Sequence, residues 1–130
     1  MAKLRKMLGK LDNPDIIALM RLIETQSQQT LSQWAIEYTA KVCLPIFEKQ
    51  LPEDSRPADA ISNCRTYLNG EIKLAQVKPF LKAAGQAARD ADGFAAAQAG
   101  ARAIGTACSV IQNPRGALGF VFYCAAAVAY

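Results

Sequence analysis

The fold of this chain is decided by the stretch AAGQAARDADGFAAAQAGARAIGTACSVIQNPRGALGFVFYCAAAVAY, which fills residues 83–130. Alanine occupies 17 of these 48 positions, and the only charged residues after Asp92 are Arg102 and Arg115. Such a segment is too poor in charge to form a solvated surface. Because methyl-sized side chains let helix backbones approach closely, the stretch predicts tightly packed helices that the rest of the chain surrounds.

Length and charge predict one domain with a basic tail. A chain of 130 residues can bury a core without disulfides or metals. Residues 11–130 carry 11 basic and 11 acidic side chains, so the net charge of +4 belongs to the first ten residues: Lys3, Arg5, Lys6 and Lys10. We therefore predict a basic N-terminal tail over residues 1–12 and a helical domain over residues 13–130. Nucleic-acid binding is not expected, because it needs basic residues clustered on a folded face.

Neither export nor membrane insertion is expected. The polar run Asp12-Asn13-Pro14-Asp15 leaves no room for the apolar core of an export signal. The uncharged run at residues 116–130 has 15 residues, whereas a membrane span needs about 20, so a buried helix is predicted there. We expect a cytoplasmic protein whose four dispersed cysteines are reduced and structural. These are Cys43, Cys64, Cys108 and Cys124.

Hydrophobic periodicity predicts an all-α fold, a compact bundle of about six helices that are mostly antiparallel. No strand alternation of convincing length occurs. The helices are expected at about residues 14–25, 31–50, 57–68, 74–91, 94–112 and 115–130. Asn69-Gly70 and Asp92-Gly93 supply two of the turns between them.

The second helix has the most detailed expectation. Thr30 and Gln33 predict a capping box at its start. Glu37 and Lys41 have the spacing of an ion pair on its exposed face. Its buried stripe is predicted to be Leu31, Trp34, Ala35, Tyr38 and Val42.

The fifth helix shows the clearest periodicity, and close helix contact is expected on it. Its inward positions are predicted to be Phe94, Ala97, Ala101, Ile104, Cys108 and Ile111. Ala101 and Gly105, four residues apart, would let a neighbouring backbone approach. Gly105→Leu is therefore expected to be destabilising by a few kcal/mol.

The sequence predicts no enzyme, no cofactor and no metal centre. It contains no histidine, which removes Ser-His-Asp and Cys-His catalysis and most zinc and haem sites. The adjacent acids Glu53 and Asp54 are expected to be solvated or to cap a helix. A hard-cation site built from Glu48, Glu53 and Asp54 is the weaker alternative.

Three polar features are candidates for partner binding or for structural ion pairs. Asp54 and Arg56 could form a rigid pair at a helix start. Arg89 and Asp90 lie in an alanine run, where Arg89 could reach Glu48 or Asp54 on another helix. Arg102, isolated among alanines, either cross-links helices or points to water. Separately, Trp34, Tyr38 and Tyr67 could line a ligand pocket, although a core position is the commoner role of such a tryptophan.

Short motifs at compatible spacings cover about residues 15–130. They are Trp34-Ala35, Leu44-Pro45-Ile46-Phe47-Glu48, Pro52-Glu53-Asp54-Ser55-Arg56-Pro57, Ala60-Ile61, Gly70-Glu71-Ile72, Ala87-Ala88-Arg89-Asp90-Ala91, Ala99-Gly100-Ala101-Arg102-Ala103 and Ala117-Leu118-Gly119. Together they resemble a family of bacterial all-helical domains labelled putative immunity proteins, which are found beside polymorphic toxin genes. Relatives often carry histidines where this chain has Gln86, Thr106, Gln112 and Gly116. Any metal or proton-transfer role of those histidines would be absent here.

The resemblance implies a non-catalytic protein that binds and neutralises a partner toxin. The exposed candidates for this contact are Glu48, Glu53, Asp54 and Arg56, at the corner between the second and third helices. The alternative is a small-molecule- or metal-binding regulatory bundle. A third hypothesis is a homodimer closed by the apolar residues 116–130.

Overall fold

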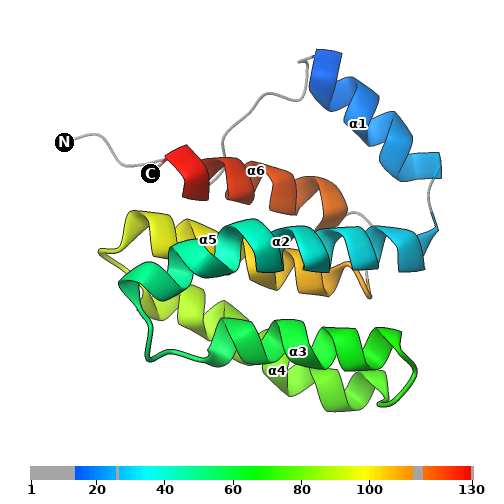
Figure 1. The fold of residues 1–130 in the computed structure, drawn as a ribbon. Coiled ribbons are helices and arrows are strands. Elements are labelled where there is room, and N and C mark those ends of the chain that lie inside the picture. The colour runs from blue at the N-terminus through cyan, green and yellow to red at the C-terminus, as the bar shows by residue number, and fades with distance from the viewer. Residues whose placement is uncertain (1–13, 26, 113–115, 130) are drawn as a thin grey trace.

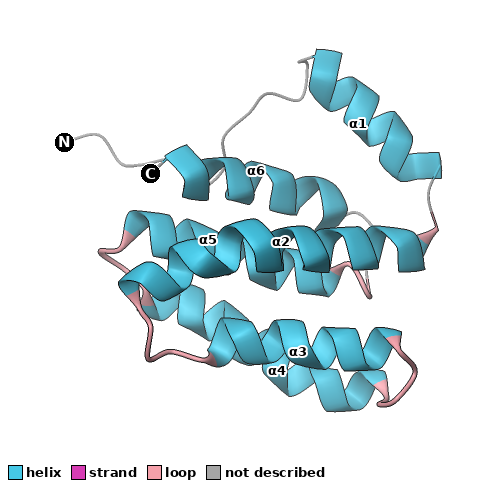
Figure 2. Ribbon diagram, in the orientation of Figure 1, coloured by secondary structure: helices cyan, strands magenta, loops and turns pink. Residues whose placement is uncertain are grey.

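The computed structural model describes residues 14–25, 27–112 and 116–129 of the chain (Figure 1). Within these ranges it contains helices and no strand (Figure 2), which confirms the predicted all-α bundle. The helices are α1 (Pro14–Thr25), α2 (Gln28–Gln50), α3 (Arg56–Leu68), α4 (Leu74–Asp90), α5 (Ala95–Ser109) and α6 (Gly116–Ala129). None of the described helices is both long enough and apolar enough to cross a membrane.

The alanine-rich helix α5 is the centre of the bundle. It packs against α2, α3, α4 and α6, whereas α1 packs chiefly on α6 and lies apart from the other helices in Figure 1. The buried residues of α5 are Ala97, Ala99, Gly100, Ala101, Ala103, Ile104, Ala107 and Cys108. The prediction that small side chains in this stretch are buried is therefore confirmed for α5. Phe94 is an exception, because it precedes the helix and is 42% exposed.

Among the described glycines, only Gly100 lies against the backbone of another helix. A Cβ atom placed on Gly100 would lie 3.2 Å from the carbonyl oxygen of Cys43 in α2, which is tighter than an ordinary contact. A Cβ atom on Gly105 would meet no atom within 4 Å. The predicted contact at Gly105 is therefore wrong. The four-residue spacing identified a face of small residues, but Gly105 faces a surface groove and Gly100 faces α2.

Helix α2 begins earlier than the sequence predicted, and it turns a different face toward the core. Ser27 is its N-cap, and the Ser27 Oγ accepts a hydrogen bond from the Thr30 N–H at 3.1 Å. The capping box at Thr30 is therefore wrong. Trp34 and Tyr38 are 37% and 45% exposed, whereas the side chains that α2 buries most completely are Ala35, Ile36, Thr39, Cys43 and Phe47. The buried stripe lies on the side of α2 that includes the close approach to α5.

Turns and loops follow the predicted chemistry more closely. Gly70 and Gly93 have φ values of +79° and +92°, a region that favours glycine. Each lies in the turn that the sequence predicted at its position. Glu37 does not pair with Lys41. Its carboxylate instead accepts hydrogen bonds from Arg65 of α3 at 2.6 and 2.9 Å. The basic tail over residues 1–12 lies outside the described residues.

All four cysteines are free and buried, as predicted. The Sγ atoms of Cys43 in α2 and Cys124 in α6 lie 2.8 Å apart. The hydrogen bond with Cys124, together with burial, raises the pKa of the Cys43 thiol. The hydrogen bond with Cys64, together with burial, likewise raises the pKa of Cys108. These thiols are therefore packing groups in the core.

Gly100 and Gly105 form a matched pair for testing the packing. Gly105→Ala should raise the free energy of unfolding by up to about 1 kcal/mol, because alanine favours helix and its Cβ enters open space. Gly100→Ala should be less stable than Gly105→Ala by about 1–3 kcal/mol, because its Cβ presses on the Cys43 carbonyl. Urea unfolding of both variants measures the difference. Equal stability of the two variants would contradict the packing described here.

Candidate functional site

One end of the bundle gathers the polar residues that the sequence singled out. The C-terminal ends of α2 and α4 and the N-terminal ends of α3 and α5 meet there (Figure 1). Phe47 of α2 is fully buried beneath this end, in a cluster with alanines of α4 and α5. The side-chain oxygen of Gln50 also accepts the Ala97 N–H at 2.9 Å and so ties α2 to the start of α5.

Arg56 is the central residue of this end. Its Nε and Nη2 atoms donate to the two carboxylate oxygens of Asp54 at 2.9 and 2.7 Å, while its Nη1 donates to Asp90 of α4 at 2.9 Å. The Asp54 carboxylate also accepts the Arg56 backbone N–H at 3.1 Å, as a capping group does. The next residue, Pro57, is buried and fixes the start of α3. The rigid pair predicted for Asp54 and Arg56 is present, and it extends to a third element.

Gln86 continues this network along α4. Its amide Nε2 donates to Asp90 at 2.7 Å, and its Oε1 accepts from Nε and Nη2 of Arg89 at 3.2 and 2.9 Å. The hypothesis that Arg89 bridges to Glu48 or Asp54 is therefore wrong, because Arg89 is held by its own helix. We call Glu48, Glu53, Asp54, Arg56 and Asp90 the ionic corner.

The electrostatics of the ionic corner favour fixed charges. The hydrogen bonds from Arg56 lower the pKa of Asp54 below its ordinary value. The hydrogen bond from Gln86, followed by that from Arg56, lowers the pKa of Asp90. The two carboxylates in turn raise the pKa of Arg56. All three groups are therefore charged at neutral pH and held in one geometry.

Two further acids complete the ionic corner without joining its network. Glu48 and Glu53 are exposed, and neither makes a hydrogen bond or ion pair within the described part of the chain. Asp92 is exposed in the turn that follows α4. No group of three or more Cys, Asp or Glu side chains in the described ranges is placed to hold a metal ion, so the cation site proposed for this corner has no support there.

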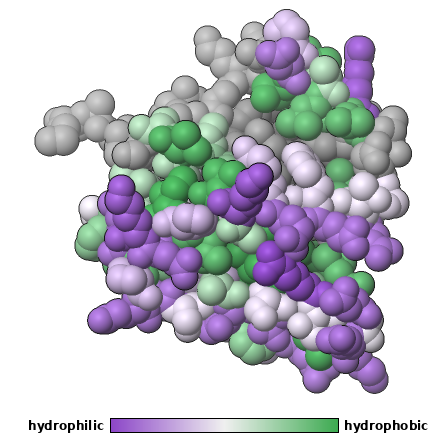
Figure 3. Space-filling model, viewed as in Figure 1, coloured by the Kyte–Doolittle hydropathy of each residue, from purple (hydrophilic) through white to green (hydrophobic). Residues whose placement is uncertain are grey.

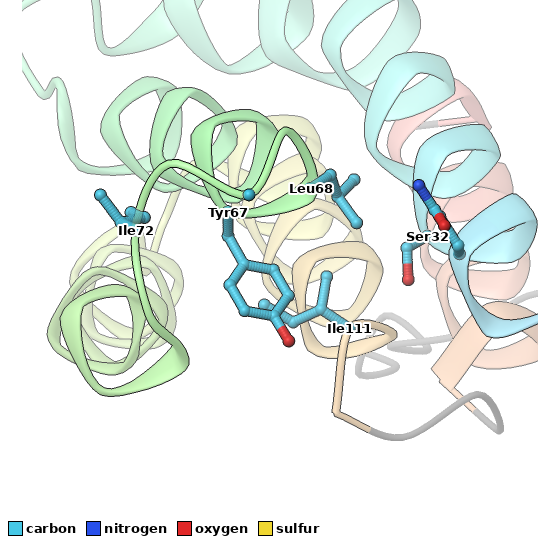
Figure 4. A pocket seen from close by; sticks show the side chains of 7 residues that line it. Ser32, Tyr67, Leu68, Ile72 and Ile111 are labelled. Atoms are coloured by element: carbon cyan, nitrogen blue, oxygen red, sulfur yellow. The ribbon is translucent and has the colours of Figure 1, made fainter.

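The three aromatic residues predicted to share a pocket lie in two. Trp34 and Tyr38 line a groove of about 560 Å³ with Leu19 of α1 and Cys124 and Val128 of α6. Figure 3 shows hydrophobic side chains gathered over α1 and α6, whereas hydrophilic ones cover the α3–α4 side. Tyr67 instead lines a second pocket of about 390 Å³ (Figure 4).

The second pocket contains a buried hydroxyl that the sequence did not single out. Ser32 of α2 is 1% exposed, lines this pocket, and its Oγ has no hydrogen-bond partner in the described structure. The other pocket walls include Gln29, Leu68, Ile72 and Ile111, and none of the described lining residues is charged. In the sequence, the available signal was a serine one turn before Ala35 and Ile36, which are both buried.

Arg102 lies in a third depression, between α4 and α5, which Arg89 and Thr106 also line. It forms no ion pair with a described acid, so it does not cross-link helices in the way that one interpretation suggested. Two positions where relatives often carry histidine adjoin this depression. Gln86 holds Arg89, and Thr106 donates its hydroxyl to the Arg102 carbonyl at 2.8 Å.

The fold and the ionic corner define an all-α protein that presents a pre-ordered set of charges. A family model described as Imm-5 like putative immunity protein matches residues 21–130. The chain therefore belongs to this family, which confirms the resemblance seen in its motifs. No curated protein and no solved structure matches the chain.

The Arg56–Asp54 contact predicts a pH-dependent stability. Because the folded pKa of Asp54 is lowered from its ordinary value of 3.8, this contribution is fully present above pH 4–5 and is lost as pH falls through the folded pKa. Arg56→Gln should lower the free energy of unfolding at pH 7 by about 0.5–1 kcal/mol. The difference from the native chain should shrink as pH falls below about 4, and it disappears only below the folded pKa of Asp54.

Urea unfolding at pH 7, 5 and 3 measures this effect. Lys41→Gln is the control, because it removes an exposed positive charge that has no described acid partner. Its small effect should not change with pH in this range. A difference for Arg56→Gln that stays constant from pH 7 to pH 3 would show that Arg56 does not act through the carboxylates.

Proposed function

We propose that this chain is a non-catalytic immunity protein that acts in the cytoplasm, where it binds and neutralises a partner toxin through the ionic corner. Family membership supports the general role. The observation that carries the choice of surface is the Asp54–Arg56–Asp90 network, which fixes three charges at one end of the bundle. Charges that are already ordered lose little entropy when a partner binds.

The sign of the charge suggests what the partner presents. Six of the chain's 11 acidic residues lie at this end: Glu48, Glu53, Asp54, Asp59, Asp90 and Asp92. Nearby Lys49, Arg56 and Arg89 offset only part of that charge. Complementary charge speeds encounter and selects the partner, so the toxin should offer a basic surface. A stable interface of this kind buries roughly 1,600 Å² in total.

Neutralisation is tested by co-expressing the chain with the toxin encoded by an adjoining gene. The chain should restore growth and should co-purify with the toxin. If cells expressing both proteins still arrest and the two proteins do not co-purify, the proposed function is wrong.

The role of the ionic corner is tested by charge reversal. The double variant Glu48→Lys, Glu53→Lys should bind the toxin at least ten-fold more weakly, mainly through slower association, and added salt should narrow the gap. Glu71→Lys is the matched control, because Glu71 is an exposed acid in the α3–α4 connection at the opposite end of the bundle. Surface plasmon resonance separates the association and dissociation rates. If the double variant and Glu71→Lys weaken toxin binding equally, the contact lies elsewhere on the protein.

Small-molecule binding is a second candidate function, and one observation favours it. The unpartnered Ser32 Oγ borders the pocket in Figure 4, where Tyr67 and apolar walls could hold a neutral ligand with a hydrogen-bonding group. A buried hydroxyl without a partner destabilises the free protein.

Ser32→Ala distinguishes a ligand site from an incidental buried hydroxyl. The substitution should raise the free energy of unfolding by about 1 kcal/mol in the absence of ligand. A thermal-shift screen of neutral metabolites should give a stabilising compound for the native chain, and Ser32→Ala should lose that stabilisation. If Ser32→Ala is strongly destabilising, its hydroxyl has a partner and the candidate fails.

A further inference from the structure

A groove of about 420 Å³ lies between α4 and α5 and is bordered by Tyr123 of α6. Small residues on the two facing helices leave the space open: Gly85, Ala88, Ala101 and Gly105. Pockets for small organic ligands commonly have volumes of about 300–1,000 Å³. The groove is therefore large enough for a small molecule and is separate from the ionic corner.

The charged residues described along this groove are both positive. Arg89 and Arg102 line it from α4 and α5, and no Asp or Glu is among the lining residues that the structure describes. The Arg89 guanidinium donates to the neutral amide of Gln86, and its Nη1 lies 3.9 Å from where a Cβ of Gly85 would stand. Arg89 therefore extends along the small-residue floor without a carboxylate partner.

Arg102 is even less compensated. Its guanidinium makes no hydrogen bond or ion pair with any described residue, although its backbone carbonyl accepts the Thr106 hydroxyl. Its side chain is only partly exposed. The groove therefore places two positively charged guanidinium groups on its wall, and both would attract an anion bound there.

We propose that this groove binds a small organic anion through a carboxylate or phosphate group. Guanidinium groups bind both kinds of oxyanion with paired, charge-assisted hydrogen bonds. Tyr123, a residue type with a phenolic donor, also lines the groove. The floor of glycine and alanine lets the body of the ligand approach the helix backbones.

The proposal is tested on the full chain with inorganic phosphate and with citrate, at constant ionic strength. One of these anions should bind saturably and raise the melting temperature by about 4 °C at ten times its dissociation constant. The anion that binds more tightly identifies the phosphate or the carboxylate as the preferred group.

Three variants locate the binding. Arg102→Gln should weaken it at least ten-fold, whereas Lys41→Gln, which removes one positive charge from the exposed face of α2, should leave it unchanged. Gly105→Leu should abolish binding and still fold, because its side chain enters the open groove. Circular dichroism confirms that each variant is folded.

Two outcomes would overturn the proposal. One is the absence of saturable binding for both phosphate and citrate. The other is equal weakening by Arg102→Gln and Lys41→Gln, which would attribute the effect to overall charge. Neither outcome bears on toxin neutralisation, because no toxin takes part in this experiment.

Discussion

The contact on which the rest of the structure depends is the approach of α5 to α2 at Gly100. The missing side chain lets the helix lie against the Cys43 carbonyl, and a Cβ atom at this position would lie 3.2 Å from that oxygen, so the neighbouring backbone would have to shift to accommodate it. This approach holds the buried side of α2, including Phe47, against the alanines of α5.

The sequence was sufficient to predict a structural feature where the local residues allow only one conformation. Gly70 and Gly93 form the turns after α3 and α4 because few residues other than glycine adopt a positive φ. Asp54 and Arg56 pair because they are two residues apart at a helix start, so the backbone alone brings them together. The alanine content of α5 likewise left burial as the only stable arrangement.

The sequence was insufficient where two arrangements satisfy the same pattern. Leu31 and Ala35 belong to a stripe with Trp34 and Tyr38 and equally to one with Ile36 and Thr39. Only the position of α5 decides between them, and it buries the second stripe. Gly100 and Gly105 present the same ambiguity, because small residues occur on several faces of α5 and composition does not say which face meets α2.

The remaining differences between the predicted and the observed candidate site come from pairs of residues that are far apart in the sequence. Asp90 reaches Arg56 across 34 positions of the chain, and Glu37 reaches Arg65 across 28, so neither partner was identifiable from spacing. Gln86 was identifiable in principle, because it stands four residues before Asp90 and three before Arg89. It was overlooked because it is neutral.

Gln86 also separates the two charged regions of α4. On one side it fixes Asp90 toward Arg56, and there each guanidinium contact has a carboxylate partner while acidic charge is in excess. On the other it holds Arg89 beside the groove, and there positive charge is unmatched. A histidine at this position could supply only one such contact from each ring nitrogen, and it would change charge near neutral pH. The glutamine keeps both contacts at every physiological pH. The two surfaces of this chain are therefore held in one arrangement that does not depend on the protonation of residue 86.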